Sequence, residues 1–192
     1  MAQIALNARA PDVFLVTLET TAGSFGIEVH RPWSPHGADR FLALVQSGYY
    51  DDSRFFRVVA GKWAQFGIAG EPAVAQAWRS RAIPDDRLIQ SNTLGFVAFA
   101  NNGPDTRSTQ VFVNLRDNAA QNDWEPGFAP FGHVVTGLDV VQALHAGYGE
   151  TSGGGMRAGM QEALFAEGNR HLDRNFPSLD RLIRTRVADA SA

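Results

Sequence analysis

Short runs of alternating apolar and polar residues, separated by turns rich in glycine and proline, are the feature that most limits the folds open to this chain. The first run, residues 13–20 (VFLVTLET), alternates with period two, and after a turn at residues 21–24 the alternation resumes over residues 25–29. A period of two is typical of strands, so this pair predicts an opening β-hairpin. The thirteen Phe, nineteen Gly and nine Pro also suit short strands and turns better than a helical bundle.

Further strands and helices are expected along the rest of the chain. Strand character returns at residues 54–59, 63–68, 94–100, 110–115, 131–135 and 182–187, the last as a closing edge strand. Helices are expected from the Ser34 cap to Gly48, over residues 138–146, and within residues 160–175. Residues 69–92 show no strong period and predict a long irregular connection.

This order of elements predicts a mainly β fold of the α+β class. We expect a closed eight-stranded antiparallel β-barrel capped by two helices, with a C-terminal helical extension. The 192 residues correspond to a single domain. Residues 1–12 form a loose N-terminal lead-in, and residues 147–192 supply a C-terminal loop, a helix and the closing strand.

Composition excludes several classes of function. Seventeen basic and twenty acidic residues leave a net charge of −3, which argues against a nucleic-acid surface or an electrostatic membrane anchor. The chain has no Cys, and its five His residues form no local ligand motif, so we expect neither a metal site nor a cofactor. No leader or membrane span is evident, so we expect a cytoplasmic protein, or a periplasmic one if a signal peptide has been removed. Nothing in the sequence demands more than a monomer, which is the state we expect.

The first candidate site residue is Arg57, which lies within the apolar run FFRVV. On a strand, Phe55 and Val59 share its face. An Arg among apolar side chains is seldom buried unless it is paired or lines a cleft. A structural ion pair, or an edge residue whose charged end reaches solvent, are the alternatives, and the pattern alone favours these two together over a functional role.

The second candidate is the polar segment 99–112 (FANNGPDTRSTQVF). Gln110 and Phe112 project from one strand face, which sets a hydrogen-bonding group beside an aromatic wall. This combination suits the binding of a peptide backbone together with an apolar side chain. A polar hairpin with Phe112 in the core is the alternative.

Three segments resemble the cyclophilin family, in the order and with the separations typical of that family. They are residues 54–67 (RFFRVVAGKWAQFG), 95–115 (GFVAFANNGPDTRSTQVFVNL) and 127–144 (GFAPFGHVVTGLDVVQAL). The tail, with GYGE, EGN and FPSLD, is similar to a bacterial branch of the same family.

The resemblance implies a peptidyl-prolyl cis–trans isomerase that acts on proline-containing peptides and on unfolded or flexible protein segments, and so assists folding. By position, Arg57 is the catalytic arginine. The implied substrate-binding residues are Phe55, Trp63, Gln65, Ala100, Asn101, Gln110, Phe112, Trp124 and Phe128. The isomerase needs no covalent intermediate, because it only has to favour the twisted amide over both planar forms.

The chain departs from the family pattern around the proposed proline pocket. Phe56 and Ala60 replace a usual His and Pro, Phe128 replaces a pocket His, and Lys62 stands where the family has a Phe against the proline. Lys62 is the feature that supports an alternative function, a proline-peptide binding module with weak or no turnover. A barrel that holds a small apolar ligand inside is a third reading, against which the large inward aromatic residues argue.

Overall fold

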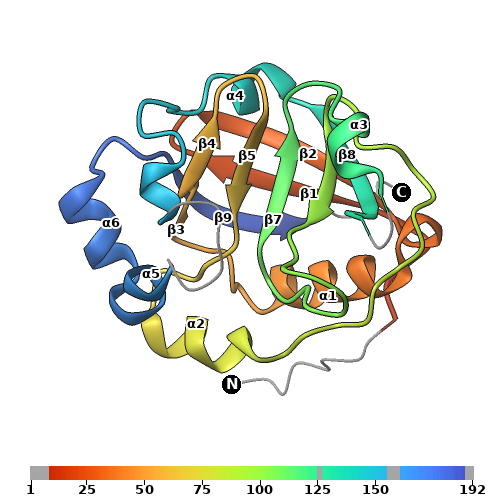
Figure 1. Ribbon diagram of the computed structural model, residues 1–192, viewed down its shortest axis with the longest axis horizontal. Coiled ribbons are helices and arrows are strands. Elements are labelled where there is room, and N and C mark those ends of the chain that lie inside the picture. Colours follow the sequence, from red (N-terminus) through yellow and green to blue (C-terminus); the bar gives the residue numbers. More distant parts are fainter. Residues whose placement is uncertain (1–8, 125–126, 155–160, 189–192) are drawn as a thin grey trace.

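Antiparallel strand pairs join into one nine-stranded sheet that curls around the core (Figure 1). The structure, a computed structural model, describes residues 9–124, 127–154 and 161–188. The strand order is β3-β9-β1-β2-β8-β6-β7-β5-β4. The strands are β1 (Val13–Thr20), β2 (Gly23–His30), β3 (Ser53–Arg54), β4 (Arg57–Val59), β5 (Trp63–Phe66), β6 (Phe96–Phe99), β7 (Val111–Asn114), β8 (Pro130–Thr136) and β9 (Arg181–Val187).

The opening hairpin forms where the alternation predicts it. β1 and β2 pair from Val13 opposite His30 to Thr20 opposite Gly23. The chain reverses at Gly23, whose φ of +131° is open to glycine and strained for other residues. The Thr20 hydroxyl donates to the Gly23 carbonyl at 2.7 Å and fixes the turn.

The prediction of a closed eight-stranded barrel is wrong, although the mainly β class is confirmed. Residues 53–59 do not form one strand. They divide into β3, which pairs with β9, and β4, which pairs with β5, and Phe55 and Phe56 lie between the two. The sheet is therefore a curled nine-stranded one with β3 and β4 at its ends.

The final strand, β9, is not an edge strand as the sequence predicted. It pairs with β1 on one side and with β3 on the other. The N-terminal hairpin is thereby tied to the last described part of the chain, which makes the C-terminal region part of the main sheet.

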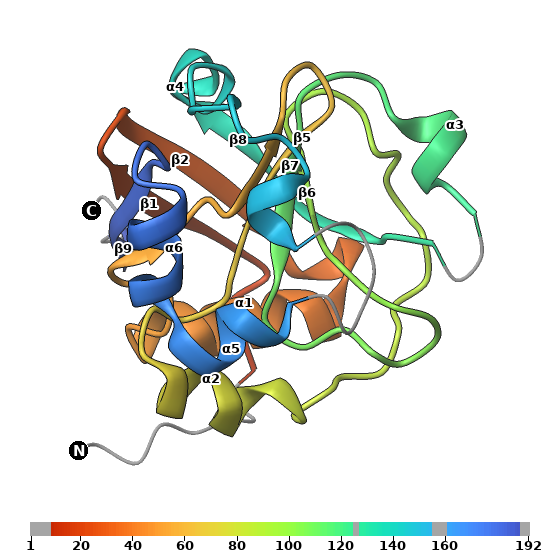
Figure 2. The ribbon, with the colours of Figure 1, turned by 60° about the vertical axis from the view of Figure 1, so that its left-hand side comes forward.

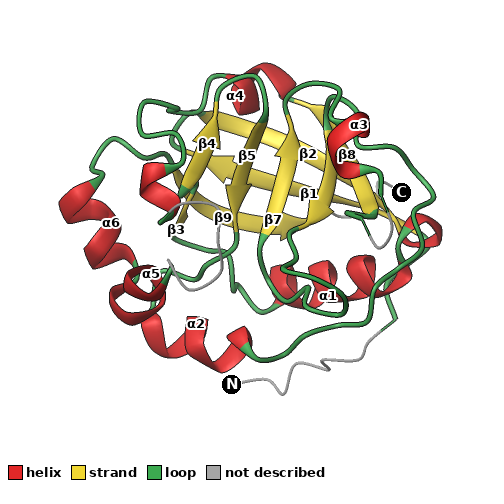
Figure 3. Ribbon diagram, in the orientation of Figure 1, coloured by secondary structure: helices red, strands yellow, loops and turns green. Residues whose placement is uncertain are grey.

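Helices surround the sheet at its ends and along one side (Figure 3). They are α1 (Pro35–Gln46), α2 (Pro72–Arg79), α3 (Ala119–Asn122), α4 (Leu138–Gln142), α5 (Glu162–Glu167) and α6 (Asn169–Asn175), with short 3₁₀ turns at Arg31–Trp33 and Thr151–Gly153. α1 and α4 lie at opposite ends of the curled sheet (Figure 1), and α5 packs against both α2 and α6 (Figure 2). The connection expected to be irregular thus contains α2, which buries Ala75 and Trp78.

α1 starts at the expected position but is capped differently. The Ser34 side chain makes no cap and instead donates to Asp86. The Asp86 carboxylate accepts from the backbone N–H groups of His36 (3.1 Å) and Gly37 (2.9 Å), which are otherwise free at a helix start. Arg107, only 1% exposed, pairs with Asp86 at 3.1 Å and ties the loop before β7 to this helix end.

The core is dominated by phenylalanine. Phe41, Phe99 and Phe131 pack with ring centroids 4.8 and 5.1 Å apart, and Phe55 packs on Phe66 at 5.3 Å. All five are fully buried. These large side chains fill the interior, so the reading of the protein as a barrel with an internal ligand has no support. Among the described residues, no helix is long and apolar enough to span a membrane.

Candidate active site

Strand register places the main candidate residues in one row on the outer face of the sheet. Arg57 on β4 is opposite Gln65 on β5, and Gln65 is opposite Phe112 on β7. Directly opposed residues of antiparallel strands project from the same face. Trp63, two residues before Gln65, shares this face, so a cation, an amide and two aromatic rings meet here.

The row forms the floor of a cleft of about 390 Å³. Its walls come from the loop before β7, from the loop after α3, and from α2 and α5. The lining residues are Arg57, Trp63, Gln65, Arg79, Ala100, Asn101, Asn102, Thr106, Ser108, Gln110, Phe112, Gln121, Asn122, Phe128, Gln161 and Phe165. The cleft is large enough for a short peptide segment.

Arg57 is held by three hydrogen bonds. Its Nε and Nη2 donate to the two Glu150 carboxylate oxygens at 2.6 and 3.1 Å, and its Nη1 donates to Gln65 Oε1 at 2.6 Å. The guanidinium also lies 4.7 Å from the centre of the Trp63 ring. Burial lowers the pKa of Arg57, and the Glu150 carboxylate opposes this shift. Three of five N–H donors are used, so two remain for a ligand.

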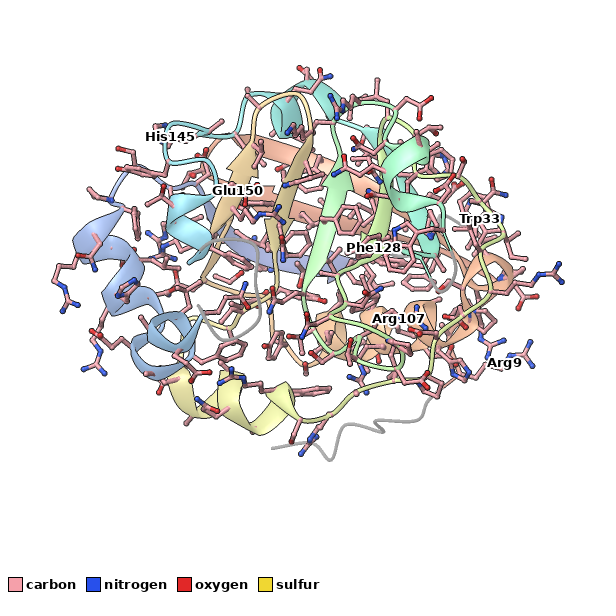
Figure 4. All side chains as sticks on the ribbon, in the orientation of Figure 1. Arg9, Trp33, Arg107, Phe128, His145 and Glu150 are labelled. Atoms are coloured by element: carbon pink, nitrogen blue, oxygen red, sulfur yellow. The ribbon has the colours of Figure 1, made fainter. Side chains whose placement is uncertain are left out.

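The structure adds Glu150, which the sequence analysis did not identify as a site residue. Its side chain is 41% exposed and reaches Arg57 from the position just before the 3₁₀ turn at Thr151–Gly153. Glu150 is labelled in Figure 4. This turn packs closely on β4, because a Cβ at Gly153 would come within 3.0 Å of the Arg57 Cβ. The Ser152 hydroxyl donates to the Phe56 carbonyl at 2.6 Å and fixes the turn there. In the sequence, this segment was noted only because GYGE resembles the tail of a bacterial branch of the family, which did not indicate a role for Glu150.

A chain of amide side chains extends from Arg57 across the cleft. Gln65 Nε2 donates to Gln110 Oε1 at 2.9 Å, and Gln110 Nε2 donates to Gln161 Oε1 at 2.9 Å. These hydrogen bonds orient the three amide groups, because each side-chain N–H donor holds the oxygen of the next glutamine toward it. Gln161 comes from the C-terminal region, so that region contributes directly to the cleft.

The part of the cleft next to this polar chain is apolar. Trp63, Ala98 and Phe112 form a small cluster separate from the main core, and Ala100 and Phe128 pack against it. The Phe112 and Phe128 rings meet edge to face at 5.4 Å. This arrangement leaves a concave apolar wall a few ångströms from a buried cation.

Two further predicted residues lie at the rim, on the segment that follows β6. Ala100 N–H donates to the Gln110 carbonyl at 2.9 Å, which joins the two sides of the loop. Asn101 Nδ2 donates to the Gly127 carbonyl at 2.9 Å and so connects this rim to the loop that carries Phe128.

Two of the predicted substrate-binding residues do not line the cleft. Phe55 is fully buried in the core, because it lies in the break between β3 and β4 and does not share the outward face of Arg57. Trp124 is 47% exposed and lies outside the lining, with its ring edge to face with Phe128 at 6.1 Å. Lys62 is also exposed and does not line the cleft, whereas Trp63 supplies the apolar wall.

Comparison with known proteins connects this chain to one enzyme family. Residues 15–160 match the family described as cyclophilin type peptidyl-prolyl cis-trans isomerase/CLD. The peptidyl-prolyl cis-trans isomerase cyp18 of Streptomyces antibioticus is 32% identical over 138 residues, covering 67% of this chain and 81% of that protein. The isomerase CYP18-2 of Arabidopsis thaliana is 30% identical over 135 residues, covering 67% and 79%.

Solved structures show the same fold. A cyclophilin-type isomerase from Cryptosporidium parvum has a TM-score of 0.66 at 17% identity and covers 93% of this chain and 99% of its own. Cyclophilin AquaCyp293 from Hirschia baltica has a TM-score of 0.65 at 16% identity and covers 96% of this chain and 77% of its own. The chain belongs to the cyclophilin-type peptidyl-prolyl cis-trans isomerase family, and it is an isomerase of X–Pro peptide bonds.

Proposed function

We propose that the cleft around Arg57 is the active site, where rotation about X–Pro bonds is catalysed without a covalent intermediate. The observation that carries this proposal is the cross-strand row in which buried Arg57, Gln65 and Phe112 adjoin, with Trp63 beside them. A proline ring fits the apolar wall of Trp63, Phe112 and Phe128, and its amide then lies beside the guanidinium. Asn101 and the Ala100 backbone bind the flanking peptide.

Arg57 lowers the barrier by favouring the twisted amide. The planar X–Pro bond resists rotation with a barrier of about 18–20 kcal/mol because the nitrogen lone pair is delocalised. As the bond twists, the nitrogen regains its lone pair and accepts a hydrogen bond from a free Arg57 N–H. This interaction is absent in the planar ground state, so it accelerates the reaction and does not merely tighten binding.

Glu150 is a positioning residue in this mechanism. Its carboxylate holds the Nε and Nη2 edge of the guanidinium, while Gln65 holds Nη1. The two donors that remain free are thereby fixed in direction before substrate binds. A preset donor loses little conformational freedom when the twisted amide forms.

We further propose that residues 1–192 act as a single domain, in which residues 1–12 are a lead-in and residues 147–192 complete the site. The place of β9 inside the sheet and of Gln161 in the cleft supports this. The partners that we propose are proline-containing peptides and flexible protein segments, bound by a monomer without nucleic acid or membrane attachment. The proposed location is the cytoplasm, with the periplasm as the alternative, and cell fractionation distinguishes the two.

NMR exchange spectroscopy of an Ala-Pro peptide tests the function. With a catalytic amount of the protein, we expect cis–trans exchange cross-peaks that the free peptide lacks on the same timescale. A binding module would instead broaden or shift the peptide signals near saturation and give no exchange cross-peaks. That outcome would overturn the proposal.

A further inference from the structure

Two histidines and a glutamate meet on the outer face of the sheet, at a place the isomerase site does not use. Glu28 and His30 are two residues apart on β2, so they project from the same face. His133 on β8 is the register partner of Glu28. One potential ligand atom from each of these three residues lies within 4.8 Å of the others.

The donor set is that of a divalent transition-metal site, and the three side chains lie close enough to form one. Zinc binds histidine nitrogens at about 2.0–2.1 Å and carboxylate oxygens at about 2.0–2.2 Å, so donors around one ion lie roughly 3.3–3.5 Å apart. Glu28 Oε1 and His30 Nε2 are already 2.8 Å apart, and the His30 and His133 ring centroids are 5.6 Å apart. The three ligand atoms lie within 4.8 Å of one another, so side-chain rotations have to bring them closer before they share one ion, and a tetrahedral site then leaves a fourth position for water.

The surroundings restrain these side chains. Trp33 stacks on His30 at a centroid distance of 3.9 Å and an interplanar angle of 13°, and Phe96 stacks on His133 at 5.6 Å and 25°. The buried Nδ1 of His133 has no hydrogen-bond partner among the described residues. A buried polar atom of this kind is costly unless it binds something.

The local charge also permits a cation. Arg31, the next residue after His30, is bound by Asp39 through two hydrogen bonds at 2.8 and 3.0 Å. Its positive charge is therefore largely balanced, and Glu28 supplies a carboxylate to the cluster. Histidine and carboxylate donors together suit Zn²⁺ and Cu²⁺ better than Mg²⁺ or Ca²⁺, which prefer oxygen ligands alone.

We propose that Glu28, His30 and His133 form a binding site for one divalent transition-metal ion, Zn²⁺ or Cu²⁺, which joins β2 to β8. No metal site was expected from the sequence, because its histidines form no local ligand motif; the β2–β8 register brings His133 opposite Glu28. Trp33 lies at the right of Figure 4, whereas Glu150 lies left of its centre, so the metal site is separate from the Arg57 end of the cleft.

Titration calorimetry of the full chain with ZnCl₂ at pH 7.5 tests the proposal. We expect one ion per chain, and a rise in melting temperature of about 5–10 °C when free Zn²⁺ exceeds its dissociation constant roughly 100-fold. His133→Ala and Glu28→Gln should each weaken binding at least about tenfold. His36→Ala, which removes an exposed histidine outside the cluster, should leave it unchanged.

Quenching of tryptophan fluorescence by Cu²⁺ is a second measurement, and it shows where on the protein the ion binds. Cu²⁺ should quench the Trp33 fluorescence, because this ring stacks directly on His30. Trp33→Phe should abolish most of the quenching while the protein still binds one Zn²⁺. Absence of Zn²⁺ binding to the folded native chain, or binding that survives in both folded variants, would overturn the proposal.

Discussion

Replacement of Glu150 by glutamine tests whether this residue positions Arg57. Glutamine keeps the length of the side chain and one acceptor oxygen, but removes the charge and one of the two bonds at 2.6 and 3.1 Å. For a carboxylate that is 41% exposed, the loss is about 1 kcal/mol after solvent screening. If that energy holds the guanidinium in its catalytic direction, kcat/KM falls about 5-fold.

The assay is the relaxation of a short X–Pro peptide from cis to trans, measured with and without the variant. Glu167→Gln is the control, because Glu167 pairs with Arg174 at 2.9 Å in an exposed ion pair that does not line the cleft. It should leave kcat/KM unchanged. In an Arg57→Ala background, Glu150→Gln should have no further effect, since the two residues act through one interaction.

A Glu150→Gln variant with unchanged or higher kcat/KM would refute the reasoning. It would mean that the carboxylate competes with substrate for the guanidinium and does not orient it. An equal loss with and without Arg57 would refute it as well, because the effect would then come from the loop and not from the ion pair.

Three other perturbations have defined outcomes. Trp63→Ala should weaken binding of proline peptides about tenfold in a peptide titration, because it removes an apolar wall of the cleft, while a peptide with Ala in place of Pro is affected less. Arg107→Ala should lower the free energy of unfolding in urea by about 3–5 kcal/mol, because it leaves the buried Asp86 carboxylate without its counter-ion; an effect below about 1 kcal/mol would contradict this. Burial raises the pKa of Asp52, but hydrogen bonds from Arg181 and Arg54 outweigh this and lower it overall. Asp52 therefore stabilises the fold above its unfolded pKa of about 3.9, and this stabilisation is lost as the pH falls through the lower folded pKa. As the pH is lowered below about 4, the melting temperature of Asp52→Asn should therefore fall less steeply than that of the native chain.

Local pattern was sufficient to predict the strands that carry the site. The β1–β2 hairpin and the strands with Arg57, Gln65 and Phe112 follow from alternation and turn residues, which act over a few neighbours. The resemblance to the cyclophilin pattern identified residues that the structure brings into one cleft, including Trp63 and Asn101.

Contacts between residues far apart in the sequence could not be predicted from the pattern of neighbouring residues. Ser34 is a good cap by residue type, yet Asp86 provides the cap from elsewhere in the chain. Glu150 carries no local sign that it pairs with Arg57. α2 was missed because it is short and buries only Ala75 and Trp78.

The break at Phe55 and Phe56 explains the two largest differences from the sequence predictions. An uninterrupted strand would place Phe55 on the same face as Arg57 and would give an eight-stranded barrel. The described chain instead turns Phe55 into the core, where it is fully buried against Phe66, and leaves Arg57 facing the cleft. The burial of Phe55 in the core thus determines the local backbone here, and the alternating pattern of residues 54–59 does not.

Cis-to-trans relaxation of an X–Pro peptide at low temperature, with the native chain, Arg57→Ala and Arg57→Lys compared, tests the central claim most directly. Uncatalysed exchange takes tens of seconds or longer, so modest catalysis is visible. We predict clear acceleration by the native chain, a loss of about 10²–10³-fold in Arg57→Ala, and only partial recovery in Arg57→Lys, which lacks the planar fork held by Glu150 and Gln65. Full acceleration by a folded Arg57→Ala variant would contradict it and would place the catalytic group elsewhere in the cleft.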